Sequence, residues 1–483
     1  RPPGRCLSQW HHKRETGSGP IHPYDSVASW IRRSRGLAVR IIVIGAGQVG
    51  ESIAADLDAD HEVVVVERDP DRVEELTYNL DVLAVQGDGT SLETLEQVSI
   101  KRADIVIAST DVDETNIVAC STVTALSDAF TVARVKQTSY LRTWQRSQHA
   151  FGVDLMVCTN LLAAQEIVRV VGLPAARDVE PFAGGLVQMA EFEVAADCEV
   201  AGHTVSDADR YDALTFVGLF RDGDVVIPRG ETQIQPDDRL VVVGPPESVR
   251  QFAPSVAESD EHRRVQEAVV VGGSEIGYQV AKSLADRGIS VRMIERDRDR
   301  ARQIAEDLPK VVVLESDATD PDFLDREHVG DADVVVSALA SDERNLLACM
   351  LAKRAGAARA ISVVDTYRYI EVFETVGVDV AVSPRRVVAE EITRLTRAGG
   401  AENVAILEAD AAEVMEFEIE QPSPLAGRPI HESVGDLPSD VVIGAITRNG
   451  DMVVPRGDTV IQVGDHVIAF TATESADELA ASL

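Results

Sequence analysis

Cysteine is scarce in this chain of 483 residues, and long apolar runs are absent. Its five cysteines are widely spaced and form no C-x-x-C or Cys/His cluster, so they predict neither a zinc site nor a disulfide framework. Few, unclustered thiols are typical of reduced proteins of the cytosol. No stretch approaches the roughly 18–20 consecutive apolar residues of a membrane helix. We therefore expect a soluble cytoplasmic protein without a bound metal.

Basic residues are also few compared with acidic ones. The chain carries 46 Lys and Arg against 81 Asp and Glu, a formal net charge of −35. Such a surface repels nucleic-acid phosphates and anionic lipids, so we expect no nucleic-acid partner. Only six of the basic residues are lysines. Excess acid with little lysine is typical of proteins from salt-loving organisms, and simple solubility is the alternative explanation.

The first 38 residues differ in composition from the rest. They are basic and show no apolar periodicity, so we expect a disordered tail over 1–38. Arg32 and Arg33 raise the question of a twin-arginine export signal. The apolar stretch behind them has the character of a strand that opens a domain, which disfavours export.

Internal repeats organise the remainder of the sequence. Segment 44–50 (IGAGQVG) returns at 271–277 (VGGSEIG), and segment 226–232 (VIPRGET) returns at 453–459 (VVPRGDT). Four further matches keep the same order, and all offsets lie between 227 and 229 residues. The chain is therefore a tandem duplication of a two-domain unit.

Two kinds of domain alternate in this duplication. In the N domains, β-branched runs alternate with helical segments, which is typical of a parallel sheet covered on both faces. The C domains hold short alternating segments between turns, which indicates a small α+β domain with a mostly antiparallel sheet. The predicted fold class is α/β, with two Rossmann-like doubly wound domains, each followed by a small α+β domain. The predicted order is N domain 1 at 39–175, C domain 1 at 176–253, a charged linker at 254–267, N domain 2 at 268–400 and C domain 2 at 401–483.

A dinucleotide fingerprint opens the first N domain. Gly45-x-Gly47-x-x-Gly50 follows a strand and opens a helix, and Glu67 ends the next strand. The glycines permit a tight turn and close approach of a pyrophosphate to the helix N-terminus. The carboxylate suits ribose hydroxyls and repels a 2′-phosphate, which favours NAD(H) over NADP(H), with an adenine nucleotide as a second candidate. Packing alone is the alternative role for the glycines. The expected loop contacts are Gly45, Ala46, Gly47, Gln48, Val49 and Gly50.

Four more residues lie where predicted strands end. Asp88 follows the third strand, on the side expected for adenosine. Thr110 and Asp111 end the fourth strand, and Arg134 lies near the end of the fifth, within reach of a phosphate. Ligand crevices open at the carboxyl ends of parallel strands, so all four are candidate contacts. A loop cap or a surface ion pair is the competing role for each.

The second copy of the fingerprint is altered. Ser274 replaces the middle glycine and places a Cβ where a pyrophosphate would pass, whereas Glu295 and Asp317 keep the ribose and third-strand positions. Either this site binds more weakly or it binds a different nucleotide. The candidate loop contacts are Gly272, Gly273, Ser274, Glu275, Ile276 and Gly277.

Catalytic motifs are missing from the sequence. Tyr278 and Lys282 have the Tyr-x-x-x-Lys spacing of short-chain dehydrogenases, but they lie on the first helix, away from the expected position of a nicotinamide ring. The histidines are scattered, and the small C domains leave no room for an organic-substrate domain. The nucleotide is therefore expected to be a signal, and we expect no enzyme activity and no catalytic residue.

The ordered motifs of about 39–480 resemble the TrkA family of potassium-uptake proteins, whose units are RCK (regulator of potassium conductance) domains. Segments 44–50, 113–116 (DETN), 133–135 (ARV) and 464–468 (GDHVI) carry the resemblance. It implies a cytosolic regulatory subunit that forms a ring of four copies beneath a TrkH-like membrane subunit that translocates potassium.

The resemblance also implies ligands. Family members bind NAD(H) and ATP or ADP in their N domains, at positions that fall on Gly45 to Val49, Glu67, Thr110, Asp111 and Arg134. Ser274 and the basic tail depart from the family pattern. An RCK-type regulator of another potassium channel or cation antiporter is the alternative, and an NAD-dependent oxidoreductase is a further one. Segments 161–171 and 385–397 are predicted helices that link N to C domains and are candidates for the moving elements.

Overall fold

The computed structural model describes residues 39–58, 61–147, 150–173, 176–211, 213–257, 265–397, 403–407, 411–438 and 440–482. The predicted tail at 1–38 and residues 258–264 of the predicted linker lie outside this part of the chain. None of the helices within it combines the length and apolar character needed to span a lipid bilayer.

The first N domain is a six-stranded parallel sheet with helices on both faces. Its strand order is β3-β2-β1-β4-β5-β6. Successive strands are therefore added on one side of β1 up to β3 and on its other side from β4 onward, so the strand order reverses between β1 and β4. Ligands of such sheets bind at the carboxyl edge near this reversal. The strands are β1 (Arg40–Ile44), β2 (Glu62–Glu67), β3 (Leu83–Gln86), β4 (Ile105–Ala108), β5 (Phe130–Val135) and β6 (Leu155–Cys158). The helices are α3 (Gln48–Leu57), α4 (Pro70–Asn79), α5 (Leu92–Gln97), α6 (Asp113–Leu126), α7 (Thr138–Arg146) and α8 (Thr159–Val171).

The second N domain repeats this sheet with the order β14-β13-β12-β15-β16-β17. Its strands are β12 (Glu267–Val271), β13 (Ser290–Glu295), β14 (Val311–Glu315), β15 (Val334–Ser337), β16 (Arg359–Val363) and β17 (Val380–Val382). Its helices are α11 (Glu275–Asp286), α12 (Arg298–Asp307), α13 (Pro321–Arg326), α14 (Asp342–Ala355), α15 (Ile370–Val376) and α16 (Pro384–Arg397).

Each C domain contains a five-stranded sheet, and its antiparallel pairing agrees with the prediction of a mostly antiparallel sheet. The orders are β10-β9-β11-β8-β7 and β18-β19-β22-β20-β21. The first contains β7 (Ala176–Phe182), β8 (Val187–Glu193), α9 (Val205–Ala208), β9 (Thr215–Arg221), β10 (Asp224–Val226), β11 (Arg239–Gly244) and α10 (Pro246–Val256). The second contains β18 (Asn403–Leu407), β19 (Ala412–Glu418), α17 (Ile430–Ser433), β20 (Val442–Arg448), β21 (Asp451–Val453), β22 (His466–Ala472) and α18 (Thr473–Ser482).

Three details differ from the sequence-based expectation. Each N sheet has a sixth strand, β6 or β17, beyond the five successive strands on which the candidate site was predicted. No strand was predicted over the edge strands β7 and β18 either. Helix α10 continues to Val256 and β12 begins at Glu267, so both ends of the predicted linker at 254–267 belong to regular elements.

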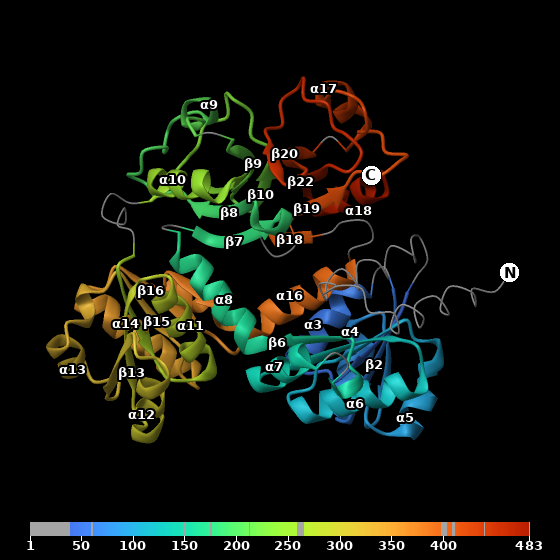
Figure 1. Cartoon of the computed structure of the whole chain (residues 1–483), viewed down its shortest axis with the longest axis vertical. Coiled ribbons are helices and arrows are strands. Elements are labelled where there is room, and N and C mark those ends of the chain that lie inside the picture. Colours follow the sequence, from blue (N-terminus) through green and yellow to red (C-terminus); the bar gives the residue numbers. More distant parts are fainter. Residues whose placement is uncertain are drawn as a thin grey trace.

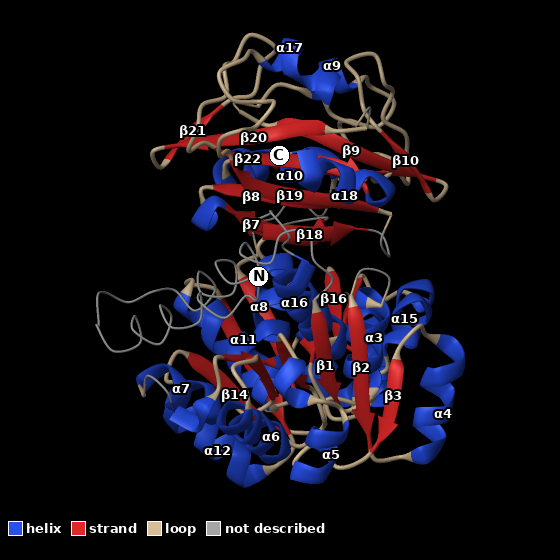
Figure 2. Cartoon of the chain, turned by 90° about the vertical axis from the view of Figure 1, so that its right-hand side faces the viewer, coloured by secondary structure: helices blue, strands red, loops and turns tan. Residues whose placement is uncertain are grey.

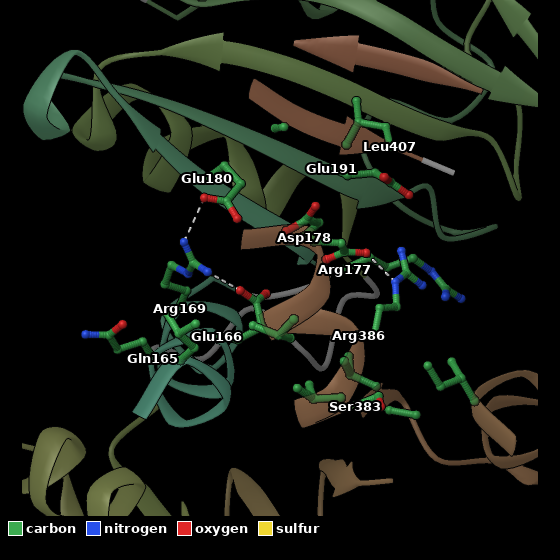
Figure 3. A pocket seen from close by; sticks show the side chains of 18 of the residues that line it. Gln165, Glu166, Arg169, Arg177, Asp178, Glu180, Glu191, Ser383, Arg386 and Leu407 are labelled. Atoms are coloured by element: carbon green, nitrogen blue, oxygen red, sulfur yellow. Dashed lines mark hydrogen bonds and ion pairs between the residues drawn. The ribbon is translucent and has the colours of Figure 1, made fainter. Parts of the chain in front are cut away.

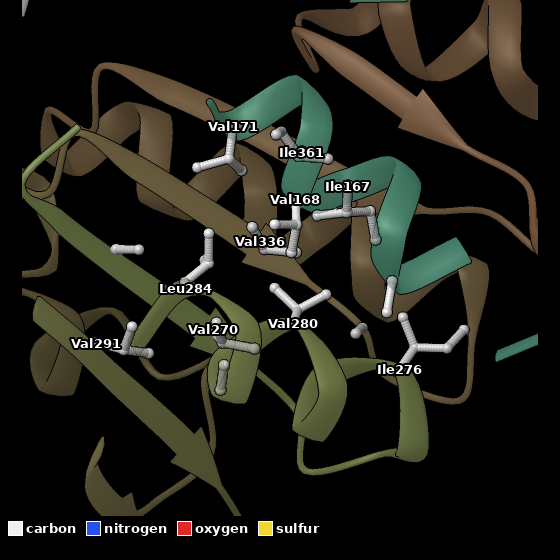
Figure 4. Close-up of a cluster of buried hydrophobic side chains, with 14 of the residues drawn as sticks. Ile167, Val168, Val171, Val270, Ile276, Val280, Leu284, Val291, Val336 and Ile361 are labelled. Atoms are coloured by element: carbon white, nitrogen blue, oxygen red, sulfur yellow. The ribbon is translucent and has the colours of Figure 1, made fainter. Parts of the chain in front are cut away.

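The last helix of each N domain is exchanged between the two copies. Helix α8 packs against α11 of the second N domain, and its Ile167 and Val168 are buried in one cluster with Val280 and Leu284 (Figure 4). Helix α16 packs in return against α3, where Val388 and Ile392 join the core of the first N domain. The two copies thus form an internal pair in which each completes the other's core.

The two C domains also pack together, above the paired N domains in Figures 1 and 2. Their sheets share a core that includes Phe182 and Val217 of the first and Ala445 and Phe470 of the second. Gly218 permits this approach, because a Cβ there would lie 2.4 Å from the Phe470 ring. Helices α8 and α16 therefore connect two joined layers (Figure 1).

Candidate functional site

The first candidate site is the carboxyl edge of the first N sheet, formed by the loop 45–50 with Glu67, Asp88, Thr110, Asp111 and Arg134. Gly45 has φ +96° and donates its N–H to Val66 O at 2.8 Å. A Cβ on Gly50 would lie 1.9 Å from Gly45 O, so this glycine allows the helix to approach the loop. Both positions need glycine for the fold itself.

Gly47 is a glycine for a different reason. Its φ of −65° and ψ of 179° are open to any residue, and a Cβ there would meet no heavy atom within 4 Å. It is the N-cap of α3, yet no side chain caps this helix. The first N–H groups of α3 therefore face space that a side chain would fill, and this space fits a phosphate.

Glu67 lies directly against the loop. Its Oε2 accepts the Ala46 N–H at 2.6 Å, and its Oε1 accepts the N–H groups of Arg68 and Asp69 at 2.6 and 3.0 Å. Arg72 of α4 donates to Ala46 O at 2.8 Å and to Glu51 at 2.7 Å. The carboxylate is thus held beside the position where a ribose would follow a phosphate on the loop.

Asp88 takes the role of a loop cap and an ion pair. It accepts from Arg68 at 2.7 Å and from the Thr90 hydroxyl and N–H at 2.7 and 2.9 Å. These interactions, the Arg68 hydrogen bond first, lower the pKa of Asp88 to about 2. Its contact with a nucleotide stays a prediction.

Thr110, Asp111 and Arg134 are brought together at the ends of β4 and β5. The Arg134 side chain is 3% exposed, donates to Thr159 Oγ1 at 3.1 Å and lies 3.5 Å from Asp111. Lys136 lies 3.0 Å from the same carboxylate. Burial by itself would raise the pKa of Asp111, but the Lys136 hydrogen bond and the nearby cations outweigh it, so this pKa lies below its ordinary value.

Asn116 organises this cluster from α6. Its side chain accepts the Thr110 N–H at 2.9 Å and donates to the carbonyls of Thr110 and Arg134 at 2.9 and 2.8 Å. The residues predicted from the sequence did not include Asn116, Lys136 or Arg72. The signal for Asn116 was its recurrence in the repeated segment at 113–116, since Asn345 makes the same bonds in the second N domain.

The second candidate site is the matching edge of the second N domain. Gly273 N–H donates to Glu295 Oε2 at 2.6 Å, as Ala46 does to Glu67. Ser274 has the backbone conformation of Gly47, but its hydroxyl accepts the Gly277 N–H at 3.2 Å and caps α11. The Ser274 hydroxyl thus accepts a hydrogen bond from its own helix, whereas at the first site no side chain accepts the N–H groups at the start of α3. Glu275 accepts a hydrogen bond from Thr138 of the first N domain at 2.7 Å.

The rest of the second edge has lost its polar cluster. Leu339 stands in the place of Thr110, because its N–H donates to Asn345, and Ala340 follows it. Val363 stands in the place of Arg134. Asp317 is paired with Arg344 at 3.1 Å and bound by Thr319, whose N–H contributes most to lowering its pKa. Of the residues predicted for this site, Glu295 lies against the loop, and the edge lacks the buried arginine of the first.

A cavity of about 490 Å³ lies between α8, β7, β8 and α16, and none of the residues named above at the two edges lines it (Figure 3). Three carboxylates, Glu166, Asp178 and Glu180, have oxygens within 4.8 Å of one another there. Arg169 pairs with Glu166 and, at 2.8 Å, with Glu180. Glu191 is 4% exposed, and burial, followed by the charge of Asp178, raises the pKa of Glu191 to about 7.

Comparison with known proteins identifies the family of this chain. The TrkA-N domain model matches residues 41–159 and 268–384, and the TrkA-C domain model matches residues 189–256 and 414–483. A Trk system potassium uptake protein TrkA homolog of Methanosarcina mazei is 34% identical, over 91% of this chain and 99% of its own length. TrkA of Halomonas elongata is 31% identical, over 89% of this chain and 95% of its own length.

Solved structures show the same fold. The RCK domain of GsuK aligns with a TM-score of 0.58 at 19% identity, covering 98% of this chain and 100% of that one. The GsuK channel bound to NAD aligns with a TM-score of 0.58 at 18% identity, covering 99% and 83%. The repeated domains and the identity along almost the whole length lead to one conclusion: this chain belongs to the TrkA family of Trk system potassium uptake proteins.

Proposed function

We propose that this chain is a cytosolic, non-enzymatic regulatory subunit of a Trk-type potassium uptake system. It binds NAD(H), or ATP and ADP, at the first candidate site and controls potassium flux through a TrkH-like membrane subunit. It lies in the cytoplasm at the inner face of the membrane through this partner, and it assembles as a ring of four copies. The family and the names of its members support this assignment.

The observation that carries the nucleotide proposal is the open N-cap at Gly47. Neither backbone conformation nor packing requires glycine there, so the missing side chain leaves room for a ligand. The free N–H groups of α3 and the adjacent Glu67 fit a phosphate followed by a ribose. At the second site, the Ser274 hydroxyl and the apolar Leu339 and Val363 favour weaker binding or a different nucleotide.

The exchanged helices suggest how binding at the edge reaches the rest of the molecule. Helix α3 begins at the loop and packs on α16, which leads to the second C domain. A nucleotide moves this system only if it binds two arrangements with different affinity. We expect nucleotide binding to change the angle between the layer of N domains and the layer of C domains.

Potassium uptake in cells that contain the membrane subunit tests the proposal. Gly47→Asp places a carboxylate in the phosphate position, and we expect it to abolish nucleotide binding and the nucleotide dependence of uptake. Gly435→Asp, after α17 in the second C domain, is the matched control, because a Cβ there also meets no heavy atom within 4 Å. Unchanged nucleotide binding and uptake in Gly47→Asp would reject the proposal, as would consumption of NADH by the purified chain. Copurification with the TrkH-like subunit tests the partner.

A further inference from the structure

An ion pair joins the two sides of the second candidate site. Arg344 donates to both carboxylate oxygens of Asp317 at 3.1 Å, and each side chain is 35% exposed. Asp317 follows β14, whereas Arg344 lies in the first turn of α14, after β15. In the sheet, β13 and β12 lie between β14 and β15. The pair therefore spans the reversal of strand order, where ligands of such sheets bind.

The loop that carries Asp317 is held in place by its own contacts. Thr319 donates its N–H and its hydroxyl to Asp317 at 3.0 and 2.7 Å. Between them, Ala318 is buried in one cluster with Val271, the last residue of β12. Because this loop is packed against the strand that leads into the fingerprint, opening of the edge requires the Arg344 side chain to move.

The matching residues of the first repeat do not form this bridge. Thr90 binds Asp88 as Thr319 binds Asp317, but the ion pair of Asp88 is with Arg68 at 2.7 Å. Arg68 follows β2, next to β3, so this pair stays on one side of the reversal, and its arginine is 62% exposed. The third position of α6 is Thr115, whose side chain cannot form an ion pair. The arginine therefore distinguishes the second repeat.

The chain itself occupies the polar groups that a nucleotide would need at the second edge. At the first site, the expected contacts are Asp88, on the adenosine side, and the N–H groups at the start of α3. At the second, the Asp317 oxygens accept from Arg344, and the Ser274 hydroxyl accepts an N–H group of its own helix. A ligand has to break these hydrogen bonds before it forms its own, which lowers its net affinity.

We propose that Arg344 is a specificity-determining residue that closes the second candidate site to the nucleotide bound at the first. This inference rests on the proposed nucleotide binding and deepens it. The ion pair with Asp317 blocks the adenosine side, and the Ser274 hydroxyl blocks the start of the helix on the phosphate side. Each chain then binds one nucleotide, so only one of the two N domains senses it.

Titration calorimetry of the full chain with NADH in high salt tests this role, and we expect the unaltered chain to bind one NADH. A reference chain carries Gly47→Asp, which disables the first site, and Ser274→Gly, which frees the start of α11. Addition of Arg344→Thr should raise the NADH affinity of this chain about fivefold, as loss of a partly exposed ion pair would. Arg344→Lys, which can still pair with Asp317, and Arg302→Thr, on the exposed face of α12, should change it less than about twofold.

The reverse change tests the same role at the first site. Thr115→Arg gives the otherwise unaltered chain an arginine at the position of Arg344, near Asp88, and its NADH affinity should fall about fivefold. Thr115→Met, which is unbranched but uncharged, should lower the affinity less than about twofold. Thermal unfolding midpoints within about 3 °C of the parent chain show that each variant is folded.

The outcomes separate the two proposals. If the unaltered chain binds no NADH, the proposed nucleotide site is wrong, and the role of Arg344 falls with it. If the unaltered chain binds two NADH with similar affinity, only the role of Arg344 is overturned. The same holds if Arg344→Thr leaves the reference chain unchanged, or if Arg344→Lys raises its affinity equally. A loss of affinity in Arg344→Thr would show that the arginine contacts the ligand, and would also overturn it.

Discussion

At the scale of single residues, the two fingerprint loops differ at one matched pair, Gly47 and Ser274, in how the following helix is capped. Both are N-caps with nearly the same backbone angles, but only Ser274 has an oxygen that caps its helix. The sequence predicted an obstruction by the Ser274 Cβ. It did not predict the hydrogen bond to Gly277, because that bond depends on the orientation of the hydroxyl group.

Gly47→Ser should therefore give helix α3 the same side-chain cap that Ser274 gives α11. Serine is an N-cap at least as good as glycine, so we expect the free energy of unfolding to stay within about 0.5 kcal/mol or to rise. NADH affinity should fall at least about tenfold, because the hydroxyl competes for the phosphate site. Thermal unfolding and calorimetry measure the two effects.

Gly50→Ala is the contrasting variant for that experiment. Its Cβ would lie 1.9 Å from Gly45 O, so this change should destabilise the fold as well as weaken binding. If Gly47→Ser lost stability to the same degree as Gly50→Ala, the open space at the N-cap would be packing space and the account of Gly47 would be wrong.

Glu191 gives a pH-dependent prediction. Burial raises its folded pKa to about 7, above the value of about 4.3 expected in the unfolded chain. The folded state therefore holds this proton more tightly, and the free energy of unfolding falls as pH rises from about 4.5 to about 7. Glu191→Gln should flatten this decline, as measured by urea unfolding across that range. A decline of the same steepness in Glu191→Gln would refute the assignment.

At the scale of elements, the regular strands of the N domains were predictable and their helix exchange was not. Runs such as 63–66 (VVVV) are typical of a strand in a sheet buried on both faces, and β2 is such a strand. Helix α8 is amphipathic, but its sequence does not say which copy of a duplicated core receives it. The edge strand β7 was missed because it carries buried Glu180 and exposed Pro181, which break the apolar alternation.

The helix exchange predicts crossed effects of two equivalent changes. Ile167 of α8 is buried in the second N core, and Ile392 of α16 in the first. Replacement of either by Ala should cost about 2–5 kcal/mol of unfolding free energy. Hydrogen exchange should then speed up in α11 for Ile167→Ala and in α3 for Ile392→Ala. The opposite assignment of the two responses would contradict the exchange.

At the scale of the whole molecule, the excess of acidic residues affects the stability of the folded chain. The net charge of −35 opposes compaction through self-repulsion. Salt shortens the Debye length from about 8 Å at 0.15 M to about 3 Å at 1 M. We expect the unfolding midpoint to rise by about 5 °C or more between these KCl concentrations.

Choline chloride at equal ionic strength is the control for the salt effect. Screening predicts a similar rise in both salts, because the charge of the cation and not its identity matters. A midpoint that does not change between 0.15 and 1 M in either salt would contradict the charge argument. The sequence predicted the acid excess and the duplication, but the contacts between layers, such as Gly218 with Phe470, join residues too distant in sequence to be paired by pattern alone.

The most direct test of nucleotide control is calorimetric titration of the full chain with NADH in high salt, with Gly47→Asp in parallel and NADH absorbance followed throughout. We predict saturable binding to the unaltered chain, loss of that binding in the variant, and constant absorbance. No binding to the unaltered chain, equal binding to both proteins, or a steady fall in absorbance would contradict a regulatory nucleotide site at the first N domain.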